Sequence, residues 1–119
     1  MKDRFEAERT ILALGALAHE TRLALFRLLV QAGAQGMAAG AIAEALALPN
    51  SSLSFHLAHL TRAGLIQQTR HSRSLIYTAN YAAMNALLGY LTENCCGGAT
   101  CAPASSCEPP VPSPERNAA

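Results

Sequence analysis

The chain has 119 residues, of which 50% are hydrophobic, 14% charged and 5% aromatic, and its formal net charge is +1. This length fits one domain and argues against two independent cores. No uninterrupted apolar run reaches the roughly 18 residues of a membrane span, and the charged N-terminus lacks the apolar region of a secretory signal. We therefore expect a cytoplasmic protein, with no membrane partner, whose thin core a dimer would extend.

Charge is divided between a basic body and an acidic tail. Residues 1–92 carry eight basic and five acidic side chains, a balance of +3, whereas residues 93–119 carry one basic and three acidic side chains, a balance of −2. A body charge of +3 is by itself weak support for nucleic-acid binding. Its placement is more informative, because Arg62, Arg70 and Arg73 have no acidic residue between them.

Helices are predicted in the first half of the chain, where apolar residues recur at helical spacing. The first spans residues 5–17, and the second, 20–30, is apolar on nearly all sides, which is typical of a buried helix. Gly33 and Gly36 follow it, glycine being tolerant of the left-handed conformation at a helix end. A short alanine-rich helix is expected over residues 39–46.

A second short helix is predicted directly after a turn. Residues 48–52 provide the turn and the helix start, with Asn50 or Ser51 as the capping residue. The helix runs to about Ala63 and stops at Gly64. Its inward side is made of leucines at positions 53, 57 and 60.

The hydrophobic period changes after this helix. Residues 65–69 and 75–78 are β-rich runs joined by the polar link 70–74, which predicts a hairpin with a basic tip. Residues 82–91 return to a helical pattern. Beyond Glu93 the chain holds two glycines and five prolines, which cannot sustain a helix or a core. We expect a domain over residues 1–92 and a tail over 93–119 that is flexible from about Gly97.

Two short helices, a tight turn between them and a following hairpin make a winged helix-turn-helix, a mainly α fold with a small β-hairpin. In such a fold the second helix presents polar groups to base edges, and hydroxyls suit both phosphate and base contacts. Arginines at the helix end and in the wing can meet phosphates or a minor groove. The predicted DNA contacts are Ser51, Ser52, Ser54, His56, His59, Arg62, Arg70 and Arg73.

Several of these residues also have a purely structural explanation. Ser51 and Ser52 can serve only as caps, and His56 can be a surface histidine. We assign Phe55 to the core or to an interface rather than to a base contact. The wing arginines can simply keep an edge hairpin soluble. Their combination in this order of elements nevertheless favours binding to double-stranded DNA.

Four segments of the chain resemble the ArsR/SmtB family of metalloregulatory repressors. They are residues 17–26 (LAHETRLALF), 42–43 (IA), 51–57 (SSLSFHL) and 60–66 (LTRAGLI), and the resemblance covers about residues 8–92. It implies a homodimer with the first and last helices at the interface. It also implies repression of a metal or metalloid resistance operon that is relieved when the ion binds.

All four cysteines lie in the tail, within residues 95–107. Thiols on one segment cannot staple distant parts of a fold, so they indicate a soft-metal site or a redox switch. The arsenic site that the family places on its third helix is a Cys-x-Cys, absent from residues 37–42, and the last-helix zinc ligands are absent from residues 80–91. Cys95, Cys96 and Cys101 resemble the C-terminal arsenic site of some family members.

Thiolates select soft ions, and three of them complete the shell of arsenic(III) or antimony(III), which we expect as the inducer. Cys107 is the weaker choice for the third ligand, because Gly97 and Gly98 permit a tight return to Cys101. Binding of zinc or cadmium by all four cysteines and a Cys101–Cys107 disulfide switch stay open.

A thiol enzyme such as an arsenate reductase is the alternative from another class. The chain has no βαβ unit, no Cys-x-x-Cys and no anion-cradling loop before the cysteines, so we expect no enzymatic activity. A metal-storage or chaperone role would leave the helix-turn-helix unexplained. The sequence therefore predicts an arsenic(III)-responsive repressor.

Overall fold

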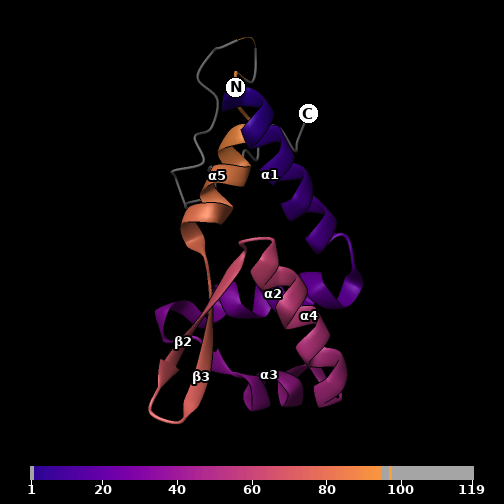
Figure 1. Ribbon diagram of the computed structural model, residues 1–119, viewed down its shortest axis with the longest axis vertical. Coiled ribbons are helices and arrows are strands. Elements are labelled where there is room, and N and C mark those ends of the chain that lie inside the picture. Colours follow the sequence, from indigo (N-terminus) through magenta and orange to yellow (C-terminus); the bar gives the residue numbers. More distant parts are fainter. Residues whose placement is uncertain (1, 95–96, 98–119) are drawn as a thin grey trace, which may run out of the picture.

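The computed structural model describes residues 2–94 and residue 97, and its elements follow the predicted order (Figure 1). They are α1 (Lys2–Leu17), α2 (Glu20–Ala32), the 3-10 turn η1 (Gly33–Gln35), β1 (Met37–Ala38), α3 (Ala39–Leu46), α4 (Asn50–Arg62), β2 (Ile66–His71), β3 (Ser74–Ala79) and α5 (Tyr81–Leu91). Helices α3 and α4 with the β2–β3 hairpin form a winged helix-turn-helix, which confirms the predicted fold class. None of the helices in this described part is long and apolar enough to cross a membrane.

The ends of the helices differ from prediction by up to three residues; α2 extends to Ala32 and α5 begins at Tyr81. Helix α1 begins at Lys2 rather than at Phe5. Helix α4 already includes Asn50 and Ser51, so the prediction that one of them is the N-cap is wrong. Pro49 takes the N-cap position with φ −66° and ψ 151°, and it has no side-chain cap hydrogen bond. The fixed φ of proline is compatible with a position just before a helix.

The hairpin is longer and tighter than the sequence pattern predicts. Strands β2 and β3 pair antiparallel from Ile66 opposite Ala79 to His71 opposite Ser74. The predicted link over residues 70–74 is therefore wrong, since only Ser72 and Arg73 turn the chain. Ser72 reverses it in the left-handed region, with φ 58°.

Strand β1 was not predicted, because two residues show no period. It joins the other edge of β3, with Met37 opposite Tyr77, and gives a three-stranded sheet in the order β1-β3-β2. Gly36 precedes it at φ 68°, and a side chain there would collide with the backbone carbonyl oxygen of Tyr77. Glycine is required at this close approach.

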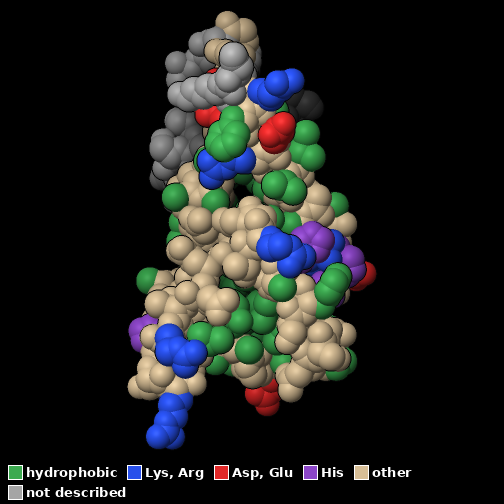
Figure 2. Space-filling model, viewed as in Figure 1, with side chains coloured by type: hydrophobic (Ala, Val, Ile, Leu, Met, Phe, Trp, Pro, Cys, Tyr) green, Lys and Arg blue, Asp and Glu red, His purple; other side chains and the backbone are tan. Residues whose placement is uncertain are grey.

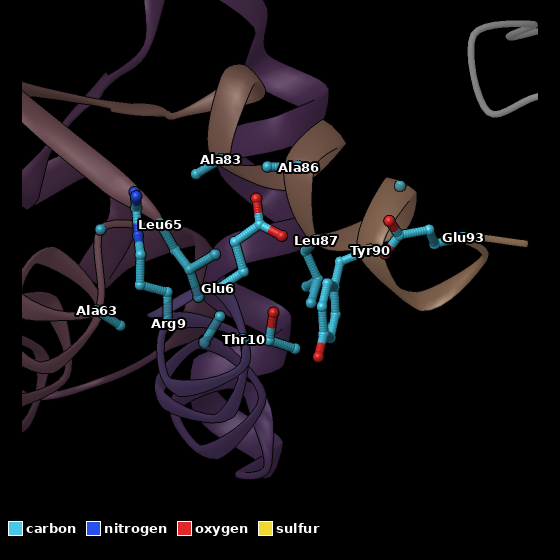
Figure 3. A pocket seen from close by; sticks show the side chains of 13 residues that line it. Glu6, Arg9, Thr10, Ala63, Leu65, Ala83, Ala86, Leu87, Tyr90 and Glu93 are labelled. Carbon is cyan, nitrogen blue, oxygen red and sulfur yellow. The ribbon is translucent and has the colours of Figure 1, made fainter. Parts of the chain in front are cut away.

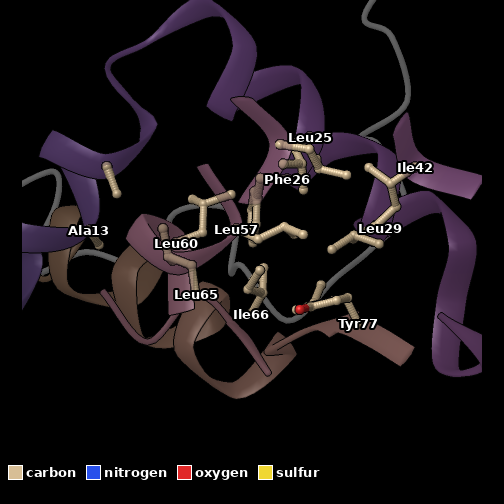
Figure 4. Close-up of a cluster of buried hydrophobic side chains, with 13 residues drawn as sticks. Ala13, Leu25, Phe26, Leu29, Ile42, Leu57, Leu60, Leu65, Ile66 and Tyr77 are labelled. Carbon is tan, nitrogen blue, oxygen red and sulfur yellow. The ribbon is translucent and has the colours of Figure 1, made fainter. Parts of the chain in front are cut away.

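The core lies between α2, α3, α4 and the sheet (Figure 4). Its largest fully buried side chains are Leu25, Leu29, Ile42, Leu53, Leu60 and Leu65. The prediction that α2 is buried on nearly all sides is wrong. The helix is amphipathic, because Leu23 is 44% exposed whereas Leu25 and Leu29 on its other side are fully buried. The inward positions of α4 are confirmed.

Helices α1 and α5 lie side by side at one end of the molecule, and α3 and the hairpin lie at the other (Figure 1). Helix α1 packs on the core through Ala13 and Ala16, while Ile11 and Leu12 are 66% and 61% exposed. Helix α5 has no fully buried residue. This end of the chain thus presents large apolar side chains that its own core does not cover.

Candidate DNA interface

One side of α4 carries an outward-facing stripe. Leu53, Leu57 and Leu60 are buried against the core. With 100° between successive residues, the positions opposite them face outward. We call these exposed residues the α4 stripe: Ser51, Ser54, Phe55, Ala58 and Arg62.

The remaining predicted contacts of α4 flank this stripe. Ser52, His56 and His59 are each half-buried. Of the predicted polar contacts on this helix, the structure therefore brings Ser51, Ser54 and Arg62 onto one continuous surface. The histidines lie toward the start of α2 instead, where other elements engage them.

His56 lies next to a buried arginine of α2. The Arg22 side chain is 8% exposed, its Nε donates to the carbonyl oxygen of Ala16 at 2.7 Å, and its Nη1 lies 3.4 Å from Nδ1 of His56. A guanidinium can only donate, so Nδ1 of His56 must accept. This contact selects the neutral imidazole with its proton on Nε2.

Electrostatics favour the same neutral form. Burial lowers the pKa of His56, and the neighbouring His19, Arg22 and His59 lower that pKa further. Desolvation lowers the pKa of His59 too, with added contributions from Arg22, Arg62 and His19. Both imidazoles are therefore harder to protonate than a free histidine side chain, which favours their neutral, hydrogen-bonding form.

Phe55 stands at the centre of the α4 stripe. Its side chain is 60% exposed, so its assignment to the core is wrong. The ring meets His56 edge-on at 5.4 Å between centroids and lies perpendicular to His59 at 6.3 Å. The two half-buried imidazoles therefore support the exposed ring from one side.

The β2–β3 hairpin, which is the wing of the fold, supplies the second basic surface. Arg70 is exposed in β2 opposite Leu75, and Arg73 is exposed in the turn. Figure 2 shows basic side chains and a histidine on the hairpin and a second basic and histidine group beside α4. No acidic residue occurs between Glu44 and Glu93, so nothing in α4, the wing or α5 offsets these charges.

Two residues that the sequence pattern did not single out support this surface from α2 and its N-terminal cap. His19 caps α2, its Nδ1 accepting from the backbone N–H of Thr21 at 3.1 Å, and its ring lies 4.9 Å from that of His56. Arg22 joins α1 to α4. A signal for it exists, because Arg22 precedes Leu25, Phe26 and Leu29 at the spacing of one helix face.

The predicted metalloid ligands Cys95, Cys96, Cys101 and Cys107 lie outside the described residues, as does most of the predicted tail. Among the side chains of residues 4–94 and 97, no group of three or more metal-ligating residues is close enough to hold an ion. Helix α5 ends at Leu91, four positions before the first cysteine.

A cavity of about 390 Å³ lies between α1, α5 and the turn after α4 (Figure 3). Small residues of α5 and the α4–β2 turn line much of it. Its polar lining comes from Glu6, Arg9 and Thr10 of α1 and from Tyr90 and Glu93 at the end of α5. Helix α5 is therefore not tightly packed against α1 on this side.

Comparison with known proteins matches this chain to helix-turn-helix transcriptional regulators in sequence and in structure. Residues 17–69 match the family model of a helix-turn-helix domain. The chain is 31% identical over 90 residues to the HTH-type transcriptional regulator YgaV of Escherichia coli (strain K12), covering 76% of this chain and 89% of YgaV. The name of YgaV specifies no inducer.

Two solved structures show the same fold. An ArsR-like transcriptional regulator from Rhodococcus sp. RHA1 superposes with a TM-score of 0.66 at 25% identity, over 71% of this chain and 77% of that one. The homodimeric winged helix-turn-helix DNA-binding domain from Mycobacterium bovis superposes with a TM-score of 0.57 at 27% identity, over 72% and 79% of the two chains.

Proposed function

The chain belongs to the ArsR family of winged helix-turn-helix transcriptional regulators, and we propose that it is a homodimeric repressor of an arsenic-resistance operon. As a member of this family it is a DNA-binding regulator and not an enzyme. In our proposal, arsenic(III) or antimony(III) bound by tail cysteines releases the repressor from its operator. Homodimerisation, repression, the target operon and the inducer go beyond what membership of the family establishes.

The α4 stripe together with the basic wing carries the DNA part of the proposal. In this assignment α4 enters the major groove, Ser51 and Ser54 meet base edges or phosphates, and Arg62 meets the backbone at the helix end. Arg70 and Arg73 meet phosphates or the minor groove beside it. Ser52, His56 and His59 then act at the flank of the stripe, the last two as neutral hydrogen-bonding groups.

Dimerisation is supported by the apolar surface of α1 and α5. Ile11 and Leu12 of α1 and Leu88 and Leu91 of α5 are each at least 43% exposed, and burying them against a second copy removes them from water. The Mycobacterium bovis relative is homodimeric. Two copies would place two α4 helices in successive major grooves roughly 34 Å apart.

The inducer part rests on the donor set and its position. Cys95 and Cys96 come four and five positions after the end of α5, and Cys101 is close to them in the sequence. Three thiolates match the soft, three-coordinate chemistry of arsenic(III). Helix α5 borders both the dimer surface and the cavity beside α1. A change at its end can therefore shift the dimer between geometries that do and do not fit two half-sites.

The proposal is tested by fluorescence anisotropy with the full chain and the DNA upstream of its own gene. We expect tight binding without additives and release by arsenite. Release by zinc or cadmium, but not arsenite, would replace the metalloid with a divalent ion. Release only by a thiol oxidant would make the tail a redox switch. Absence of specific binding would refute the repressor assignment.

A further inference from the structure

We infer that Phe55 reads thymine in the operator through apolar contact with the thymine C5-methyl group. The inference deepens the proposed function and rests on α4 being the helix that enters the major groove. It assigns to this aromatic ring a role in sequence specificity.

The exposure of Phe55 is the first observation. A phenylalanine that is 60% exposed in the middle of a helix leaves a large apolar surface in water, which is unfavourable unless a partner covers it. The partner is not the protein's own core, because Leu53 and Leu57, two positions away on either side, occupy that side of α4. It must approach from the outward side.

The neighbours of Phe55 indicate DNA rather than another protein. On the α4 stripe the ring is surrounded by Ser51, Ser54 and Arg62, and Ala58 is the only other apolar member. A protein–protein patch would need contiguous apolar side chains at its centre. A basic surface with one aromatic ring among hydroxyls instead matches a major groove, whose only apolar feature is the thymine methyl.

The ring is also held in place from behind. Its edge-on contacts with His56 and His59, at 5.4 Å and 6.3 Å, restrict its rotation, and such arrangements are favourable for aromatic pairs. His56 is in turn fixed by Arg22. A supported ring loses little conformational freedom on binding, so a contact with a single methyl group can affect affinity measurably.

Deoxyuridine provides a direct test, because it lacks only the methyl group of thymidine and retains every hydrogen-bonding group. A duplex selected by the wild-type protein from a randomised library is remade with thymidine replaced by deoxyuridine, one symmetric pair of positions at a time. Anisotropy is measured with wild-type protein, Phe55→Ala and, as a control that truncates an exposed apolar side chain outside the α4 stripe, Leu23→Ala on α2.

At one symmetric pair of positions we expect the wild type to lose about fourfold in affinity per methyl, the amount expected for uncovering one buried methyl group. Phe55→Ala should bind the two duplexes equally, whereas Leu23→Ala should still discriminate. Equal binding of both duplexes by the wild type would overturn the inference while leaving the repressor assignment intact.

Discrimination that persists in Phe55→Ala would assign the methyl contact to another residue and also overturn the inference. Failure of the library to yield any preferred duplex would refute the proposed function itself. Circular dichroism of both variants establishes that they are folded, since neither side chain contributes to the core.

Discussion

The guanidinium of Arg22 lies 3.4 Å from Nδ1 of His56 and donates to the carbonyl oxygen of Ala16 at 2.7 Å. One buried side chain thus connects the end of α1, the first turn of α2 and the middle of α4. Since α1 belongs to the apolar end and α4 to the proposed DNA interface, Arg22 bridges the two parts of the molecule that our proposal couples.

Replacing Arg22 should destabilise the fold. Arg22→Met keeps an apolar side chain of similar length but removes both polar contacts and leaves the carbonyl oxygen of Ala16 without its donor. We expect the free energy of unfolding in urea to fall by about 2 kcal/mol. The control is Arg27→Met on the exposed side of the same helix, which should change it by less than about 0.5 kcal/mol. Equal effects would show that Arg22 is not a structural link.

Stability should decrease as the pH falls below about 6.5. In the unfolded chain His56 takes up a proton around its ordinary pKa of 6.5, whereas burial with His19, Arg22 and His59 lowers that pKa in the folded chain. The unfolded state therefore binds more protons in this range, and stability is lost as the pH falls from 6.5 through the folded pKa. Urea unfolding from pH 8 to pH 5 measures the loss.

His56→Gln should reduce this pH dependence, because glutamine does not titrate. His71→Gln, which removes an exposed imidazole of the wing, is the matched control and should retain it. If the two variants showed the same pH profile, the low pKa of His56 would not be coupled to folding.

Charge removal at the wing should weaken binding to every DNA sequence. Arg73→Ala is expected to lower affinity for specific and random duplexes alike and to reduce the slope of log K against log salt by about one per protomer. Arg4→Ala, which removes an exposed arginine from α1 at the opposite end of the molecule, should leave the slope unchanged. An unaltered slope in Arg73→Ala would show that the turn does not contact phosphate.

A polar substitution on α5 should separate the dimer. Leu88 is 43% exposed and Leu23 of α2 is 44% exposed, so Leu88→Asp and Leu23→Asp place the same charge at equally accessible positions. Sedimentation at micromolar concentration is expected to give a monomer without operator affinity for Leu88→Asp. Leu23→Asp should remain dimeric. A wild-type monomer at this concentration would refute dimerisation through these helices.

Loss of a tail thiol should uncouple DNA binding from the inducer. Cys95→Ser and Cys96→Ser are each expected to bind the operator normally and to remain bound at arsenite concentrations that release the wild type. Cys107→Ser serves as the matched control and should respond almost as the wild type does. Because thiols must ionise to bind, the arsenite affinity of the wild type should rise with pH toward the thiol pKa of about 8.5.

The third thiol is tested separately. Cys101→Ser should also fail to release the operator, as the other two serine variants do. Normal arsenite response in Cys101→Ser would assign the third ligand elsewhere. Response of this variant only to an organoarsenical would indicate a site of two thiols.

Local sequence patterns determined most of the secondary structure and the candidate contacts of α4. Helical spacing of Leu53, Leu57 and Leu60 predicts which side of α4 is buried, and the same spacing places Ser51 and Ser54 outward. These predictions succeed because a helix repeats every 3.6 residues whatever surrounds it. The order of helices and strands then suffices to indicate the winged fold.

Other features depend on contacts between residues far apart in the chain. The pairing of Arg22 with His56, the strand at Met37 and the exposure of Ile11 and Leu12 all follow from how the helices and sheet pack. Periodicity identifies an apolar face but not what covers it. For α1 that face lies away from the core, because Ala13 and Ala16 let the helix pack closely with its small side chains and leave the large ones outside.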